Sequence, residues 1–204
     1  MPGIKVYSID GVTPVVDPSS YVHPSAVLIG DVMIGRNCYI GPLASLRGDF
    51  GRIIIEDGAN VQDTCVMHGF PGTDTLVETN GHIGHGAVLH GCRIRRGALV
   101  GMNAVINDNA EIGEFAIVAA MSFVKAQMQV PPRMLAAGTP ARIIRALTEV
   151  EMAWKAEGTR SYQDLTLRCL RTMEETVALT APEPRRKRLD LPELLPLSEL
   201  KAKS

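Results

Sequence analysis

Residues 94–124 read IRRGALVGMNAVINDNAEIGEFAIVAAMSFV, and this stretch decides the fold. An aliphatic residue returns every six positions, and the residue four positions after it is always alanine or serine. A period of six is neither the 3.6 of an α-helix nor the 2 of an ordinary strand. A fixed repeat of this kind predicts a solenoid that is built from short, equivalent strands.

The same period runs outward through most of the first 130 residues. Before residue 47 it holds at six aliphatic positions: Val16, Val22, Leu28, Ile34, Ile40 and Leu46. Three extra residues then interrupt it between Arg47 and Ile54. After a second, longer interruption between Met67 and Ile83 it continues, with one residue missing before Ile94. Both interruptions are therefore insertions into a regular solenoid.

Each hexad predicts one face of a triangular prism, and three hexads complete a coil of about 18 residues. Successive coils stack at about 4.8 Å, the ordinary spacing of paired strands. The aliphatic first positions fill the axis, and the small fifth positions fit inside the corners. The predicted fold class is thus all-β, a single-stranded parallel β-helix over residues 1–130.

The segment after residue 130 changes character. The Pro131-Pro132 pair predicts the end of strand pairing, and residues 138–141 predict a turn. Thr148, followed three residues later by Glu151, is a capping box that opens a helix, and the Gly158-Thr159 pair separates it from a second helix. Residues 131–181 are therefore expected to form a turn and C-terminal helices that pack along the prism.

Composition limits the partners and the location. A net charge of −1 leaves no excess positive charge to hold a nucleic acid. No basic and apolar leader opens the sequence and no run of about 18 apolar residues occurs, which predicts a cytoplasmic protein that does not bind a membrane. The four cysteines lack metal or redox spacing and are expected as core thiols. Residues 182–204, rich in proline and charge, predict a basic solvated tail.

Three histidines fall within 23 residues. His68 and His90 both follow an aliphatic first position, and their separation of 22 equals one coil plus a four-residue insertion. They are therefore expected to stack on one face in adjacent coils. His85 lies on the preceding face, about 16 Å of extended chain from His90. Metal–nitrogen bonds of about 2.0 to 2.1 Å cannot span that gap.

If the three histidines share an ion, His85 has to come from a neighbouring chain. A three-fold rotation closes such a head-to-tail contact, which predicts a homotrimer with a site at each subunit interface. The same counting places Arg47 in the column of His68 and Asp63 under His85. We predict that Arg47 pairs with Asp63 across the interface, with either a structural or a site-supporting role. His23 and His82 are expected at the surface.

The strings LRGD at 46–49, NVQD at 60–63 and GHGAVLHGC at 84–92, together with His68, resemble the γ-class carbonic anhydrase family as far as about residue 175. The longer strings at 47–53, 65–71, 95–104 and 153–163 resemble its phenylacetate-degradation branch, with a carnitine-operon branch as near competitor. The resemblance implies a left-handed β-helix, and zinc, or else iron or cobalt, on His68, His85 and His90. It also implies a thioesterase that cleaves hydroxylated phenylacetyl-CoA or related ring-derived CoA thioesters.

In the predicted mechanism a metal-bound hydroxide attacks the thioester carbonyl. Gln62 is expected to orient the water, Arg47 and Asp63 to hold the subunits in register, and Tyr162 either to reach the site or to be a packed helix residue. Phe50 stands where efficient relatives carry glutamate, which argues against fast CO2 hydration. The alternatives are a γ-class carbonic anhydrase, a hexapeptide acyltransferase and a non-enzymatic pathway scaffold.

Overall fold

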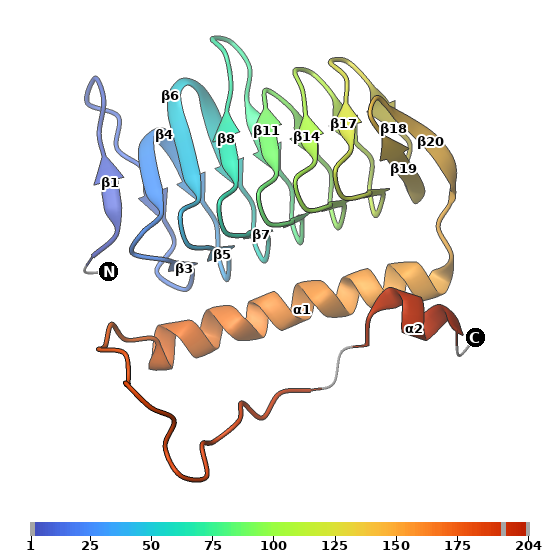
Figure 1. The fold of residues 1–204 in the computed structure, drawn as a ribbon. Coiled ribbons are helices and arrows are strands. Elements are labelled where there is room, and N and C mark those ends of the chain that lie inside the picture. The colour runs from blue at the N-terminus through green and yellow to red at the C-terminus, as the bar shows by residue number, and fades with distance from the viewer. Residues whose placement is uncertain (1–2, 193–194, 203–204) are drawn as a thin grey trace.

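The computed structural model describes residues 3–192 and 195–202. Residues 1–2 of the predicted prism and 193–194 and 203–204 of the predicted tail lie outside the described residues. The predicted prism is confirmed. Short strands stack in parallel into a left-handed β-helix of about seven coils, and a long helix runs beside it (Figure 1).

The first face of the prism is one parallel sheet. Its strands, in order, are β3 (Tyr21–Val22), β5 (Tyr39–Ile40), β7 (Asn60–Val61), β10 (His82–Ile83), β13 (Leu99–Val100), β16 (Ile117–Val118) and β19 (Met134–Gly138). The antiparallel strand β20 (Ala141–Ala146) ends this sheet. This is the face over which the long helix lies.

The other two faces join into a second sheet, because β4 (Val27–Ile34) and β6 (Ser45–Ile55) each run around the corner between them. The second face continues through β8 (Val66–His68), β11 (Val88–His90), β14 (Val105–Ile106) and β17 (Phe123–Val124). The third face continues through β9 (Thr75–Val77), β12 (Arg93–Ile94), β15 (Glu111–Ile112) and β18 (Gln129–Val130). At the N-terminal end β1 (Lys5–Tyr7) and β2 (Val15–Val16) pair with β4.

The axis of the prism is filled as the repeat predicts. From Val22 to Val124 every aliphatic first position is buried, and wherever the residue four positions later is alanine, cysteine or serine, that residue is buried too. Val16, in the first coil, is only half-buried because no complete coil covers it. Register explains the first interruption. Gly30 pairs with Gly48 and Val32 with Ile53, so four residues of β6 oppose one residue of β4, which is the insertion of three.

The prism ends later than predicted. Pro131 and Pro132 lie in a turn between two faces, where the missing N–H costs no ladder bond. After that turn, β19 pairs in parallel with β16 through Leu135 and Ala136 and adds one more rung. The predicted turn at residues 138–141 then connects β19 to β20.

The expectation of two C-terminal helices before residue 181 is wrong. One helix, α1 (Glu149–Thr172), continues through Gly158 and Thr159. A glycine inside a helix costs about 1 kcal/mol, and packing against the prism offsets this cost. The hydroxyl of Thr159 also bonds back to the Lys155 carbonyl at 3.2 Å. No helix in the described ranges is long and apolar enough to cross a membrane.

The predicted tail is only partly solvated. Residues 173–192 are exposed, but a second helix, α2 (Leu197–Ala202), returns to contact α1. The indole N–H of Trp154 donates to the Leu195 carbonyl at 3.1 Å and fixes this return. The chain therefore folds back on the helix near the end of the prism that carries β20 (Figure 1).

The predicted capping box is confirmed. The Thr148 side chain accepts from the Glu151 N–H, and the Glu151 carboxylate accepts from the Thr148 N–H. We expect Thr148→Ala to lower the free energy of unfolding by about 1 kcal/mol, because the Glu151 N–H at the start of the helix loses its side-chain acceptor. Urea unfolding followed by helical circular dichroism measures this change. Thr172→Ala, at the exposed C-terminal end of α1, is the matched control and is expected to be neutral.

Candidate metal centre

His68 and His90 end two neighbouring strands of the second face. They are in register across β8 and β11, so the stacking expected from their spacing of 22 is confirmed. Nδ1 of His68 lies 3.2 Å from Nε2 of His90. Two nitrogens that share one tetrahedral zinc at 2.0 to 2.1 Å lie about 3.3 to 3.4 Å apart. The pair therefore already has the spacing of two ligands to one ion.

A carboxylate holds the opposite nitrogen of each ring. Asp49 Oδ1 lies 3.0 Å from Nε2 of His68, and Asp108 Oδ1 contacts Nδ1 of His90. A carboxylate only accepts hydrogen bonds, so in neutral rings the nitrogens that face Asp49 and Asp108 carry the protons. The two nitrogens that face each other then both present lone pairs. Such lone pairs repel unless they share a cation, and carboxylate–histidine pairs are the usual support of metal-binding imidazoles.

His85 lies elsewhere on the same chain, in the turn after β10. Its Nδ1 is 2.5 Å from Asp63 Oδ1, and the predicted position of Asp63 under His85 is confirmed. Nε2 is thereby left as the nitrogen available to a ligand. Within residues 3–192 and 195–202 of one chain, no three histidine, cysteine or acidic side chains are grouped so that they could hold a metal. The third ligand to His68 and His90 stays a prediction that requires a second chain.

Gln62 lies on the first face beneath His85 and not beside His68 and His90. Its amide is buried, and Nε2 is 3.0 Å from Asn60 Oδ1 and 2.8 Å from His82 Nε2. Its Oε1 accepts from the His85 backbone N–H at 3.2 Å. The expectation of a surface His82 is wrong, because the ring is enclosed between the prism and α1, and burial lowers its pKa to about 3.

Arg47 takes a partner within its own chain. Its Nη1 lies 2.8 Å from Asp49 Oδ2 and its side chain is 45% exposed. In the single chain Asp63 is occupied by His85, so the Arg47–Asp63 pair across an interface stays a prediction. Arg47 supports His68 indirectly here, because it holds the carboxylate that contacts that ring.

Two phenylalanines lie against the histidine pair. The Phe50 ring centroid is 5.4 Å from that of His68, and Phe70 stacks on His90 at 6.2 Å. Phe50 is 66% exposed, so a large apolar surface stands open beside the ligands. Both rings lie where the repeat is interrupted, Phe50 in the segment 49–52 and Phe70 in the loop 69–74.

Tyr162 packs on the first face, away from His68 and His90. Its ring lies 5.3 Å from that of Tyr39 and 5.4 Å, edge-on, from that of His82. Burial raises its pKa, so the phenol keeps its proton at neutral pH. In the single chain Tyr162 is therefore a packed helix residue and does not reach His68 and His90. It nevertheless lines the same groove as Gln62 and His85.

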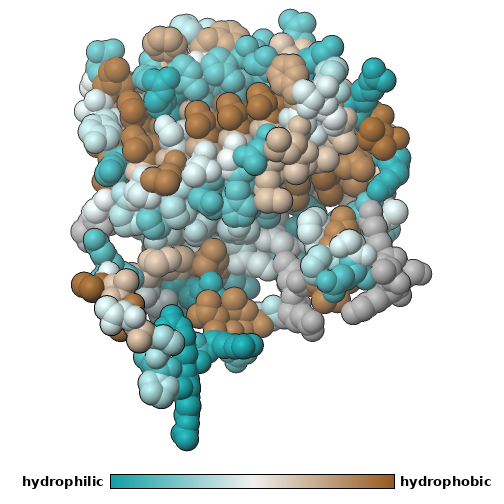
Figure 2. Space-filling view, viewed as in Figure 1, coloured by the Kyte–Doolittle hydropathy of each residue, from teal (hydrophilic) through white to brown (hydrophobic). Residues whose placement is uncertain are grey.

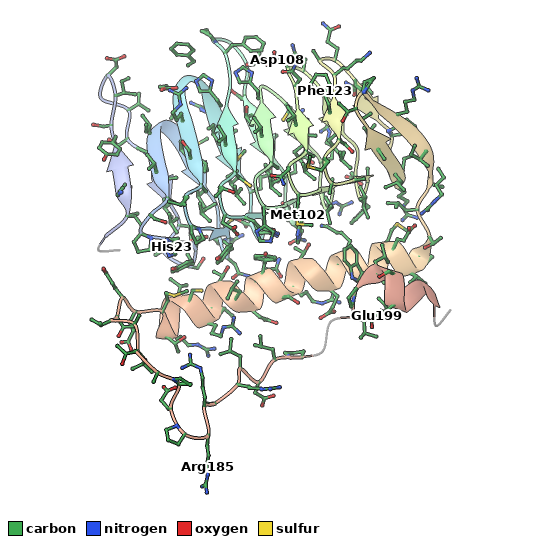
Figure 3. The ribbon with its side chains drawn as sticks, viewed as in Figure 1. His23, Met102, Asp108, Phe123, Arg185 and Glu199 are labelled. Carbon is green, nitrogen blue, oxygen red and sulfur yellow. The ribbon has the colours of Figure 1, made fainter. Side chains whose placement is uncertain are left out.

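Sequence reasoning missed three residues: Asp49, Asp108 and His82. Asp108 follows His90 by 18, one full coil, so the coil period could have paired them. Figure 3 shows Asp108 at the side of the prism remote from α1, whereas Met102 points toward the helix. His82 is the first residue of β10, but its enclosure depends on α1. Its contact in that helix, Thr159, lies 77 residues further along the chain. No local pattern signals such a contact.

Comparison with known proteins shows the family. The chain is 60% identical to the carnitine operon protein CaiE of Proteus sp. over 186 residues, which are 91% of this chain and 94% of that protein. It is 58% identical to CaiE of Escherichia coli K12, with 91% and 95% covered. No family model matches the chain. The finer resemblance to the phenylacetic acid degradation protein PaaY is not shown by these relatives and stays a prediction.

Solved structures agree in fold. A Bacillus cereus protein named as a candidate acetyltransferase superposes with a TM-score of 0.80 at 33% identity, covering 81% of this chain and 96% of that one. A hexapeptide transferase family protein from Anaplasma phagocytophilum gives a TM-score of 0.78 at 33% identity, covering 82% and 99%. The chain belongs to the CaiE family of hexapeptide-repeat proteins, which is related to the hexapeptide transferases and the γ-class carbonic anhydrases.

Proposed function

We propose that this protein is a metal-dependent enzyme that hydrolyses a CoA thioester at the boundary between two subunits. One observation carries the proposal. Nδ1 of His68 and Nε2 of His90 face each other at 3.2 Å while Asp49 and Asp108 hold their other nitrogens. This arrangement suits a divalent ion, for which zinc is the first candidate and iron or cobalt the alternatives.

The second face supports a homotrimer. A hydrophobic band crosses the prism on the face of β8, β11, β14 and β17 (Figure 2). Its members lie in register beside the histidine column: Val66, Val88, Val105 and Phe123. Val66 is 40% exposed in the single chain. A neighbouring subunit that covers this band would also bring its own His85 to His68 and His90.

The bound ion would supply Lewis-acid polarisation of a carbonyl oxygen and a lowered pKa of water. The chain's own residues prepare this chemistry. Asp49 and Asp108 fix the ring orientation and tautomer of His68 and His90. Gln62, whose buried amide accepts from the His85 backbone N–H, supports the turn that would offer His85 to a neighbour, and Arg47 and Asp63 keep the subunits in register. Phe50 and Phe70 exclude water from one side and receive the acyl group.

These two rings limit the acyl group to two kinds. Their flat faces suit an aromatic acyl group, such as hydroxylated phenylacetyl or a ring-derived chain. The carnitine operon relatives suggest a different acyl group. A quaternary ammonium also binds over aromatic faces, so a carnitine-like CoA thioester fits the same surface. A panel of CoA thioesters that contains both kinds distinguishes them through kcat/KM.

We expect removal of the metal to abolish thioester hydrolysis. The purified trimer is dialysed against a chelator, analysed for metals, and assayed for free CoA thiol with and without added zinc. Activity should disappear with the metal and return with it, because water attacks the thioester only slowly without Lewis-acid assistance. Full turnover by the metal-free protein would refute the proposal.

A second candidate is a hexapeptide acyltransferase. The two solved structures at 33% identity carry transferase names, so the named relatives favour this candidate over hydrolysis. Its mechanism needs a histidine base and no metal, and the His85–Asp63 pair offers one. Activity that survives chelation and depends on an added amine or hydroxyl acceptor would establish it.

Two other candidates remain testable with the same preparation. For carbonic anhydrase activity, Phe50 stands beside His68 where a carboxylate would be needed to carry protons. Stopped-flow CO2 hydration measures that activity beside CoA release. For a scaffold role, the double variant His68→Ala/His90→Ala should keep its biological function, whereas it should lose that function in an enzyme.

A further inference from the structure

A buried polar cluster connects α1 to the turn that carries His85. At its centre lies His82, whose ring is edge-on to Tyr162 at 5.4 Å between centroids. Nδ1 of His82 is 3.4 Å from the Thr159 hydroxyl. Because both Tyr162 and Thr159 belong to α1, the position of His82 depends on the docking of that helix.

The partners of His82 define its tautomer. Nε2 of Gln62 lies 2.8 Å from Nε2 of His82, and an amide nitrogen only donates. The Asn60 amide nitrogen also lies near the ring, 3.3 Å from Nδ1. Because the Gln62 contact is the shorter one, we assign Nε2 of His82 as the acceptor and place its proton on Nδ1, facing the Thr159 hydroxyl. The second amide hydrogen of Gln62 is donated to Asn60 Oδ1 at 3.0 Å. Both hydrogens of this buried amide are used, so rotation of the side chain would break two hydrogen bonds.

The other end of Gln62 reaches the candidate ligand. Its Oε1 accepts from the backbone N–H of His85 at 3.2 Å, while Asp63 holds the His85 ring at 2.5 Å. The adjacent residues Gln62 and Asp63 thus hold His85 at two points, one on the backbone and one on the ring. A residue held at its backbone and at its ring keeps the free ring nitrogen in one direction.

We propose that His82 is a positioning residue that acts through Gln62 on His85. By accepting from the Gln62 amide it keeps Oε1 under the His85 N–H, and α1 in turn holds His82. The role of His85 as the ligand given to a neighbouring subunit rests on the proposed function. The His82–Gln62–His85 relay itself lies within one chain and can be tested without metal.

The test is a double-mutant cycle with two readouts. His82→Phe keeps a ring and removes the acceptor, and Gln62→Met keeps the length and removes the amide. Hydrogen exchange of the His85 amide should accelerate about fivefold in either variant, as expected for loss of one hydrogen bond. Cobalt(II) affinity of the trimer, followed by absorbance, should fall about tenfold. The double variant should match the single variants, because His82 acts only through Gln62.

Controls separate positioning from packing. His23→Phe, at a half-buried histidine bonded to Ser25, should change neither readout. His82→Gln restores an acceptor and should recover most of the exchange protection. Additive effects in the double variant, or unchanged His85 exchange in His82→Phe, would overturn the relay. If exchange responds as expected but the wild-type trimer binds no cobalt, the relay is supported and the metal site is refuted.

Discussion

Replacing His90 with alanine is expected to abolish metal binding and CoA-thioester hydrolysis together. His90 supplies one of the two nitrogens that face each other at 3.2 Å, and no other described side chain replaces it there. Losing residues that only support a ligand costs about 10- to 100-fold in metal affinity or activity, so losing a ligand should cost more than about 100-fold. Metal analysis of the purified protein and a CoA-release assay measure the two losses.

The matched control for this variant is His23→Ala. His23 follows β3, its ring is bonded to Ser25 at 2.8 Å, and it has no part in the candidate centre. This control should keep both metal and activity. A His90→Ala protein that is folded, metal-loaded and fully active would eliminate the site. The variant is expected to fold, because the ring of His90 faces away from the axis while Leu89 fills it.

The second large effect concerns the axis of the prism. We expect Ile112→Ala to lower the free energy of unfolding by about 2 to 5 kcal/mol, because the removed groups leave a cavity that stacked coils cannot close. Ile112 is fully buried and lies in register between Ile94 and Val130. Chemical denaturation of the purified protein at fixed concentration gives this change.

Ile144→Ala makes the same chemical change at the surface. Ile144 lies in β20 and is 55% exposed, so this variant is expected to lose less than about 0.5 kcal/mol. Equal losses in the two variants would show that the repeat positions do not form the stabilising core. A solenoid coil contacts only its neighbours, so the loss from Ile112→Ala should be concentrated around β12, β15 and β18.

The fold was predictable because its information is local and repeated. Each hexad places one aliphatic residue on the axis, and the repeat alone defined the coils, the insertion of three residues between Arg47 and Ile54, and the stacking of His68 on His90. The end of the prism and the single helix were not predictable from propensity. Pro131-Pro132 and Gly158 each disfavour regular structure, but the first lies in a corner turn and the second in a helix stabilised by packing.

The sequence could predict contacts in the candidate site only between residues that the repeat places on the same face in adjacent coils. Counting hexads placed Asp63 under His85, and the same count could have placed Asp108 beside His90. The burial of His82 could not be predicted, because it depends on Thr159 and Tyr162 in a helix far along the chain. The intrachain partner of Arg47 was likewise missed, since a side chain two residues away competes with one on another subunit.

The direction of β20 has a consequence for self-association. A parallel ladder presents at its last rung the same unpaired edge that joins its inner coils, so identical molecules could add end to end into a filament. Here the terminal rung β19 is covered by β20, which runs antiparallel and has exposed arginines at 142 and 145. On this face the next molecule would meet an antiparallel edge strand, with Arg142 exposed and Arg145 paired with Glu151, in place of a parallel rung, which opposes continuation of the ladder there.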